Sequence, residues 1–404
     1  MGAALLGQHA VTGAPRRLAP TSPNVVVVPN CLRGFASAAE VAHALAAGVR
    51  RALPGSRVSV LPLADGGDGT LDALAAIGTA RWMSTTALDA LGRFRRVPWL
   101  ILERCTAAVE TAAVCGLRAL RADELRPLDA TSSGVGQALA AAVSAGASRV
   151  LVGLGGTAVV DGGAGALAAL GARFLDARGR ELTPRPGALS QAVRVDVAPA
   201  RRMLADVEVQ LLSDVRTPLA GSIASFGAQK GLTERDRSVA EAALHHLVDL
   251  LEDAGVPEIR ARFYRQWLGA GGGIGFGLSS VVLTTAGPGA ERLLALLDPD
   301  DAVGTAALAI TGEGKVDATT WIGKLPGAVA DRRRKRGLPT AVVAVQFAGD
   351  APGALVSQHP VVDVRPPPTG ATGAVTGADL WCGLARAAED ACVAWLLRGS
   401  VVRP

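Results

Sequence analysis

Short runs of β-branched apolar residues alternate along this chain with alanine- and leucine-rich stretches of helical periodicity. The first run, "NVVVVP", covers residues 24–29, and the second, "RVSVLPL", covers 57–63. Between them Ser37 and Glu40 form a capping box, which predicts a helix that ends before the Pro-Gly pair at 54–55. This alternation predicts an α/β fold with largely parallel strands.

The middle of the chain has a different pattern. Residues 94–115 hold two strand-like runs with a turn near 104–106, which indicates an antiparallel hairpin in a second domain. Further buried strands are predicted at 147–156, 207–215, 306–314 and 338–345. We interpret this order as one domain interrupted by an insertion. The predicted division is a flexible tail at 1–22, a discontinuous domain of 23–80 and 286–398, and an inserted domain of 81–285.

Composition narrows the class of protein. The chain has 404 residues, of which 49% are apolar, so it can build two or three domains. No apolar run reaches the roughly 18 residues that a membrane span needs. The first residues have no basic region ahead of an apolar one and do not predict a secretory signal. Five cysteines without a CxxC spacing favour a reduced, cytoplasmic setting.

Charge gives little reason to expect a nucleic-acid or membrane partner. The net charge of +5 is spread along the chain, with one dense block, "RRRKR", at 332–336. We interpret this block as the solvated end of a helix, where basic residues suit the helix dipole; a nucleic-acid patch is the alternative. Aromatic residues make up only 3%, so surfaces for stacking bases are poorly supplied. We expect a small-molecule partner and a monomer or homodimer.

Four predicted strand ends combine glycines with an acid ahead of a helix. They are "DGGDGT" at 65–70, "GGTAVVDGGAG" at 155–165, "DVRTP" at 214–218 and "GEGKVD" at 312–317. In parallel sheets, ligands bind at the carboxyl ends of strands, where helix N-termini present free N–H groups to anions. The four loops together favour a phosphate or nucleotide site over structural turns. We expect the glycines at 65–70 to let the backbone approach the ligand.

Familiar short motifs do not account for these loops. "GEGKV" and "IGKLP" lack the spacing of a Walker A motif, and "GVGQAL" at 134–139 lacks the third glycine of the dinucleotide fingerprint. The five histidines are scattered apart from the pair at 245–246. Neither a zinc site nor a Ser-His-Asp triad is predicted.

Taken together, the motifs resemble the bacterial type I glycerate kinases. The matching stretches, in that family's order, are "ADGGDGT" (64–70), "LGGTAVVDGGAGALAALG" (154–171), "SDVRTPLAG" (213–221), "FGAQKGLT" (226–233), "GAGGGIGFGLS" (269–279) and "ITGEGKVDATTWIGKLP" (310–326). The resemblance spans about residues 24–396. It implies a discontinuous flavodoxin-like (Rossmann-like) parallel-sheet domain with a second mixed α/β domain inserted in it. It also implies an enzyme that transfers phosphate from ATP, with Mg²⁺, to a hydroxyl of glycerate.

Candidate site residues follow from the loops and from this resemblance. Phosphoryl transfer needs positioning and charge neutralisation, which lysines and carboxylates with Mg²⁺ supply. We predict Asp65, Asp161 and Asp214 as catalytic acids and Asp68 as a metal ligand; each acid has a helix cap as its alternative. The predicted substrate contacts are Asn30, Arg33, Gly155, Gly156, Thr157 and Lys230. The predicted ATP contacts are Gly312, Glu313, Asp317 and Lys324.

The chain also departs from the family pattern, mainly in its first loop. The family usually has a carboxylate, two hydroxyl residues and a lysine in this loop, an asparagine before the second Asp-Gly-Gly and a glutamate in the first. Here these positions are Asn30, Cys31, Phe35, Arg33, Val160 and Asp68. Two alternatives therefore stay open: a kinase of another polyol, sugar acid or cyclitol, and a non-catalytic metabolite-binding paralogue. The retained acids and lysines argue against the second.

Overall fold

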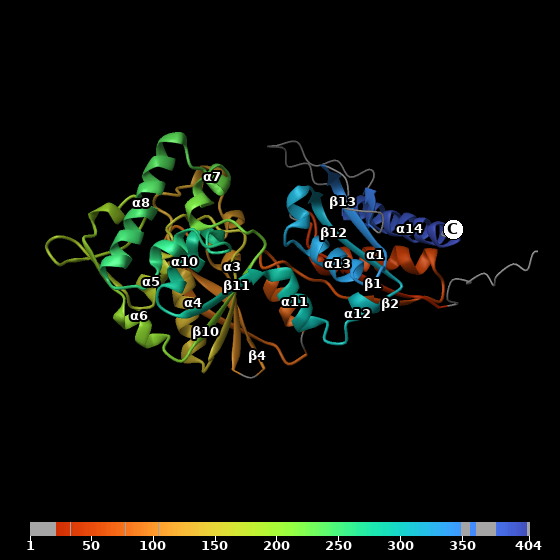
Figure 1. The fold of residues 1–404 in the computed structure, drawn as a ribbon, viewed down its shortest axis with the longest axis horizontal. Coiled ribbons are helices and arrows are strands. Elements are labelled where there is room, and N and C mark those ends of the chain that lie inside the picture. The colour runs from red at the N-terminus through yellow and green to blue at the C-terminus, as the bar shows by residue number, and fades with distance from the viewer. Residues whose placement is uncertain are drawn as a thin grey trace, which may run out of the picture.

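The computed structural model describes residues 22–32, 34–76, 78–103, 105–348, 356–360 and 377–401. Its strands form two large sheets, which lie in the two halves of an elongated molecule (Figure 1), and one small sheet. The predicted tail at 1–22 lies outside the described residues except for residue 22. Arg33 also lies outside them.

The first sheet is parallel throughout. It contains β1 (Asn24–Pro29), β2 (Arg57–Val60), β12 (Leu308–Val316), β13 (Thr340–Phe347) and β14 (Val356–Pro360), in the order β14-β13-β12-β1-β2. Neighbours pair in register, for example Val25 with Leu308 and with Val58. Strands from both ends of the sequence thus lie side by side in one sheet.

The second sheet is mixed. It contains β3 (Arg81–Leu88), β4 (Phe94–Leu102), β5 (Thr106–Glu110), β6 (Arg149–Gly153), β10 (Glu208–Ser213) and β11 (Leu283–Pro288), in the order β11-β10-β6-β5-β4-β3. The pairs from β11 to β5 are parallel, whereas β5, β4 and β3 pair antiparallel. The β4–β5 pair confirms the predicted hairpin. The small sheet contains β7 (Arg173–Leu175), β8 (Glu181–Leu182) and β9 (Arg194–Asp196).

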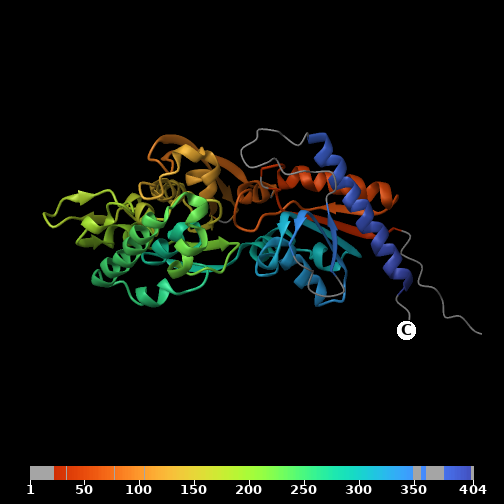
Figure 2. The same ribbon diagram turned by 90° about the horizontal axis from the view of Figure 1, so that it is seen from above.

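Helices cover both large sheets (Figures 1 and 2). They are α1 (Ala38–Ala52), α2 (Thr70–Ala75), α3 (Thr111–Cys115), α4 (Ser133–Ser144), α5 (Ala164–Ala169), α6 (Ala198–Met203), α7 (Ser222–Phe226), α8 (Glu234–Asp253), α9 (Ile259–Phe263), α10 (Ile274–Ser279), α11 (Gly289–Leu297), α12 (Ala302–Thr305), α13 (Leu325–Arg334) and α14 (Gly377–Val401). The predicted capping box of Ser37 and Glu40 is confirmed at the start of α1. None of the helices in the described ranges is both long and apolar enough to cross a membrane.

Alternate side chains of β1 pack in two different cores, one on each face of the parallel sheet. Val25 and Val27 pack in a core with α1 and α14, whereas Val26 and Val28 pack in a core with α2, α11 and α13. Successive side chains of a strand point to opposite faces, so an unbroken run of four valines predicts a strand that is buried on both sides. The prediction of an α/β fold with a parallel sheet and a second part that mixes helices and strands is confirmed.

The sheets also bear on how the chain is divided. It leaves the parallel sheet after β2, builds the second sheet, and returns to the parallel sheet at β12. Because β11 (Leu283–Pro288) pairs with β10, residues 286–288 belong to the second sheet, although we had placed them in the discontinuous domain. The division into domains stays a prediction.

The stretch "GEGKV" at 312–316 is part of β12 rather than a loop after a strand. It pairs with β13 as far as Val316 and Phe347. Our prediction of a strand followed by a glycine-rich loop was wrong here. Gly312 lies so close to β13 that a Cβ would be 2.5 Å from the carbonyl oxygen of Val343. This glycine therefore permits close pairing of strands.

The basic block at 332–336 is less solvated than we predicted. Arg333 is fully buried and donates hydrogen bonds to the carbonyl oxygens of Val303, Ala306 and Pro339. Burial lowers the pKa of its guanidinium to about 10. Arg332 pairs with Asp301 at 2.5 Å. The block is thus partly internal, and two of its arginines join α13 to α12.

Candidate functional site

A cavity lies where the strand order of the parallel sheet reverses. β1 has β2 on one side and β12 on the other, and ligands of open α/β sheets bind beyond the strand ends at such a point. The cavity has a volume of about 500 Å³, and its lining includes Asn30, Asp65, Glu313, Lys315 and Lys324. We call it the switch-point cavity. It brings together four residues that we predicted from the sequence; Lys315 is an addition.

Two polar pairs hold the side chains of the switch-point cavity. Asn30, just after β1, donates from Nδ2 to Oδ2 of Asp65 at 2.8 Å, and both residues are buried. Lys324, just before α13, lies with Nζ 3.5 Å from Oε2 of Glu313. Burial raises the pKa of the Glu313 carboxyl, and Lys324 opposes that rise. The cavity therefore presents a cation and carboxyls at the strand ends.

The loop at 65–70 lies against the carboxyl ends of the second sheet. A Cβ on Gly66, whose φ is +99°, would lie 2.6 Å from the carbonyl oxygen of Leu212 in β10. A Cβ on Gly155 would lie 2.4 Å from Cα of Gly67, and the Gly155 N–H donates to the Gly66 carbonyl at 3.1 Å. We had expected these glycines to let the backbone approach a ligand. Gly66 and Gly67 instead approach the second sheet, whereas Asp65 lines the switch-point cavity and Asp68 and Gly69 line a second one.

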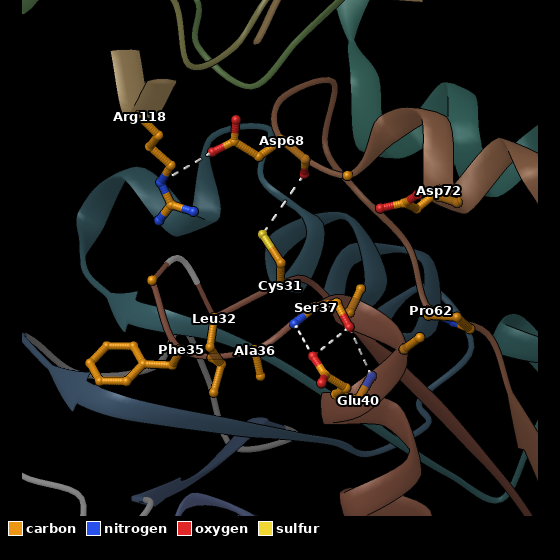
Figure 3. A pocket seen from close by; sticks show the side chains of 15 residues that line it. Cys31, Leu32, Phe35, Ala36, Ser37, Glu40, Pro62, Asp68, Asp72 and Arg118 are labelled. Atoms are coloured by element: carbon orange, nitrogen blue, oxygen red, sulfur yellow. Dashed lines mark hydrogen bonds and ion pairs between the residues drawn. The ribbon is translucent and has the colours of Figure 1, made fainter. Parts of the chain in front are cut away.

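A second cavity, of about 570 Å³, lies beside the loop that follows β1, which we call the first loop (Figure 3). Cys31 and Phe35 line both cavities, so the first loop separates them. Asp68 and Asp72 line the second cavity, as does Arg118 from η1 (Leu117–Ala119). Arg118 Nε lies 3.8 Å from Asp68 Oδ2. The two acids of the loop thus serve different cavities: Asp65 the first, Asp68 the second.

Glu110 was missed by our sequence reasoning. It is the last residue of β5, is buried, and accepts hydrogen bonds from the backbone N–H groups of Gly69 at 3.3 Å and Leu71 at 2.9 Å. Burial raises the pKa of its carboxyl to about 7, and the nearby Asp68 and Asp72 add to that rise. The sequence does place an acid at the end of the strand-like run "TAAVE". We missed it because, unlike the four loops chosen above, it has no glycines beside it.

Asp161 and Lys230 lie in the interior and line neither cavity. Asp161 accepts hydrogen bonds from Ser132 and from the N–H groups of Gly163 and Gly165, at the start of α5. Burial raises the pKa of this carboxyl, which the hydrogen bonds oppose. These contacts match the alternative that we gave for Asp161, a helix cap.

Lys230 has a similar interior position. Its Nζ donates to the Val159 carbonyl at 2.7 Å and to Oγ1 of Thr157 at 3.2 Å. Burial lowers the pKa of its ammonium group to about 8. Lys230 and Thr157, which we predicted as substrate contacts, are thus hydrogen-bonded to each other in the interior.

The remaining predicted residues that the structure describes are absent from the linings of both cavities. Asp214 follows β10 directly and is half-buried. Gly156 has φ +71°, and a Cβ there would lie 2.6 Å from Oδ1 of Asp68. Asp317 caps η7 (Ala318–Trp321), where its Oδ1 accepts from the Thr319 N–H at 3.0 Å. The hydrogen bond from the Thr319 hydroxyl, and secondarily the one from its N–H, lower the pKa of the Asp317 carboxyl.

The donor set of the switch-point cavity suits a magnesium-bound phosphate. Mg²⁺ is usually held by one or two carboxylates, with phosphate oxygens and waters completing its shell. Asp65 and Glu313 can supply carboxylate oxygens, while Lys324 and Lys315 can neutralise phosphate oxygens. Within the described ranges, no group of three or more His, Cys, Asp or Glu residues is placed to hold a metal ion. A magnesium ion in this cavity would therefore need phosphate oxygens among its ligands.

Comparison with known proteins points to one family. The sequence profile of the glycerate kinase family matches residues 25–375. Glycerate kinase of Bacillus subtilis is 34% identical over 81% of this chain and 86% of its own length. Glycerate 2-kinase of Escherichia coli is 31% identical over 83% of this chain and 88% of its own. The crystal structure of "putative glycerate kinase 2" from Salmonella typhimurium superposes with a TM-score of 0.73 at 26% identity, covering 95% of this chain and 100% of that one.

Proposed function

The chain belongs to the glycerate kinase family, and from that premise we propose that it transfers the terminal phosphate of ATP to a hydroxyl of glycerate. The observation that carries the proposal is the meeting of Asn30, Asp65, Glu313 and Lys324 at the switch-point cavity. The relatives named above are kinases of glycerate. They favour glycerate over the alternatives of another polyol or of a non-catalytic paralogue.

We assign roles by chemistry and position. Lys324 and Lys315 would bind phosphate oxygens as point charges, and Asp65 and Glu313 would hold Mg²⁺, which supplies further positive charge when bound. Asp65 is also the acid best placed to orient a substrate hydroxyl, since it is fixed by Asn30 at 2.8 Å. Asp68 lines the second cavity and has no assigned role in the switch-point cavity.

Because the reaction consumes ATP, we place the protein in the cytoplasm; a monomer or homodimer remains our expectation.

The Asn30–Asp65 hydrogen bond gives one departure from the family pattern a physical reason. An amide at position 30 can donate to Asp65, whereas a carboxylate there would place two negative charges at hydrogen-bond distance. The substitution therefore changes the charge of the site but keeps its acid in place. This supports retained kinase activity.

The test of substrate is a panel assay. Purified protein with ATP and Mg²⁺ is given D-glycerate, other sugar acids and cyclitols, and release of ADP is measured. We expect D-glycerate to be used with kcat/KM above about 10⁴ M⁻¹s⁻¹, as for ordinary enzymes. Faster use of a cyclitol or another sugar acid would assign the chain a different substrate, and no ADP release with any compound would favour a non-catalytic paralogue.

Lys324→Ala is expected to raise the apparent KM for ATP by about tenfold, which corresponds to about 1.4 kcal/mol of lost binding. The reason is the loss of a cation that lines the switch-point cavity beside Glu313. Initial rates at varied ATP give the result. Lys335→Ala, at an exposed position just after α13, is the matched control and should leave KM unchanged. An unchanged ATP dependence in Lys324→Ala would remove Lys324 from the ATP site.

A further inference from the structure

We propose that Glu110 is a positioning residue for phosphoryl transfer, which anchors the loop at 65–70 so that Asp65 and Asp68 face their cavities. The proposal rests on the proposed kinase function. Glu110 lines neither cavity, and it acts through the backbone that it holds.

The anchor joins the two large sheets. Glu110 ends β5 in the second sheet, while the loop that it holds comes from β2 in the parallel sheet. Its two carboxylate oxygens divide between two donors: Oε1 accepts from Gly69 N–H, and Oε2 from Leu71 N–H. These two N–H groups flank the start of α2, where helical backbone donors have no partner within the helix. One carboxylate thus satisfies both.

The loop is also held against the second sheet at a second point, on the strand next to β5. In the parallel pair of β5 and β6, Glu110 lies opposite Gly153, and a Cβ on Gly153 would be 2.9 Å from the carbonyl oxygen of Gly66. The same loop is therefore pressed on β6 at Gly66 and held at Gly69 and Leu71 by Glu110. Between these anchors lies Asp68, and directly before them lies Asp65.

The loop's position matters because phosphoryl transfer depends on geometry. Misplacing a reacting group by about 1 Å can cost about a hundredfold in rate. A neutral amide in place of Glu110 keeps its size but offers one acceptor oxygen for two N–H donors, because its NH₂ group is itself a donor. One end of the loop would then lose its hydrogen bond, while the cavity linings keep their residues.

The test compares Glu110→Gln with Glu208→Gln, a matched change in the same sheet. Glu208 begins β10, at the opposite end of the strands, and pairs with Arg149 at the surface. We expect Glu110→Gln to lower kcat by about tenfold or more while the KM for ATP changes less than about threefold. Hydrogen–deuterium exchange of the peptide covering 65–74 should become faster. The Glu208→Gln variant should match the parent protein in all three readouts.

A second variant keeps the test decisive if Glu110→Gln folds poorly. Glu110→Asp keeps the charge but draws the carboxylate back by one methylene group, so we expect its kcat to lie between the parent and the Gln variant. The proposal is overturned if kcat per folded molecule is unchanged in both variants, or if exchange at 65–74 stays slow. Because exchange is measured without substrate, it reports the anchor even if glycerate is not the substrate; failure of the parent protein to phosphorylate glycerate would count against the proposed function instead.

Discussion

Replacing Asp65 with asparagine is expected to lower kcat with ATP and glycerate by at least about tenfold, which is about 1.4 kcal/mol of barrier. Asp65 is buried at the switch-point cavity and receives a hydrogen bond from Asn30 at 2.8 Å. The asparagine can still accept that hydrogen bond through its carbonyl oxygen. The substitution removes the negative charge of Asp65, so we expect its main effects on the binding of Mg²⁺ and on the orientation of the substrate hydroxyl.

Steady-state kinetics and thermal unfolding together check this prediction. The melting temperature should change by only a few degrees, because size and the Asn30 contact are kept. Asp206→Asn, at an exposed position before β10, is the control and should leave both quantities unchanged. If Asp65→Asn unfolds the protein but the folded fraction keeps full activity, Asp65 has a structural role.

Replacing Arg333 with methionine is expected to lower the free energy of unfolding by about 3 kcal/mol, with activity of the folded protein unchanged at low temperature. The guanidinium is fully buried and satisfies carbonyl oxygens at Val303, Ala306 and Pro339. Methionine fills a similar volume but donates no hydrogen bond, and each buried acceptor left without a donor costs about 1–3 kcal/mol. α13 would lose its hydrogen bond to Val303 of α12, while the pair of Arg332 with Asp301 would remain.

Urea unfolding, followed by circular dichroism, gives the free energy directly. Arg334→Met is the control, since Arg334 is exposed and pairs only at the surface with Asp331; such pairs contribute about 0–1 kcal/mol. Equal losses in the two variants would show that the buried guanidinium adds no stability beyond that of a surface charge.

The fold was predictable from the sequence because its strands have an unambiguous pattern. Four consecutive valines in β1 demand burial on both faces, and the capping box at Ser37 marks the start of α1. The stretch at 312–316 was mistaken for a loop because glycine usually breaks strands. In this chain Gly312 serves the close pairing of β12 with β13, a tertiary contact that local sequence does not reveal.

The site was predictable in part. Asn30, Asp65, Glu313 and Lys324 meet because the carboxyl ends of parallel strands share one edge of a sheet, a rule that needs only strand order. Asp161 and Lys230 have the residue types of a site, but their partners are backbone groups and hydroxyls of the interior. Glu110 was missed because its partners are backbone N–H groups some forty residues earlier, and such contacts leave no pattern in the sequence.

The most direct test of the account is to identify the product. Purified protein is incubated with ATP, Mg²⁺ and D-glycerate, and the mixture is followed by ³¹P nuclear magnetic resonance. We expect a phosphomonoester of glycerate to appear in step with ADP, and Asp65→Asn to slow both equally. Folded protein that binds ATP yet forms no phosphoglycerate would contradict the account.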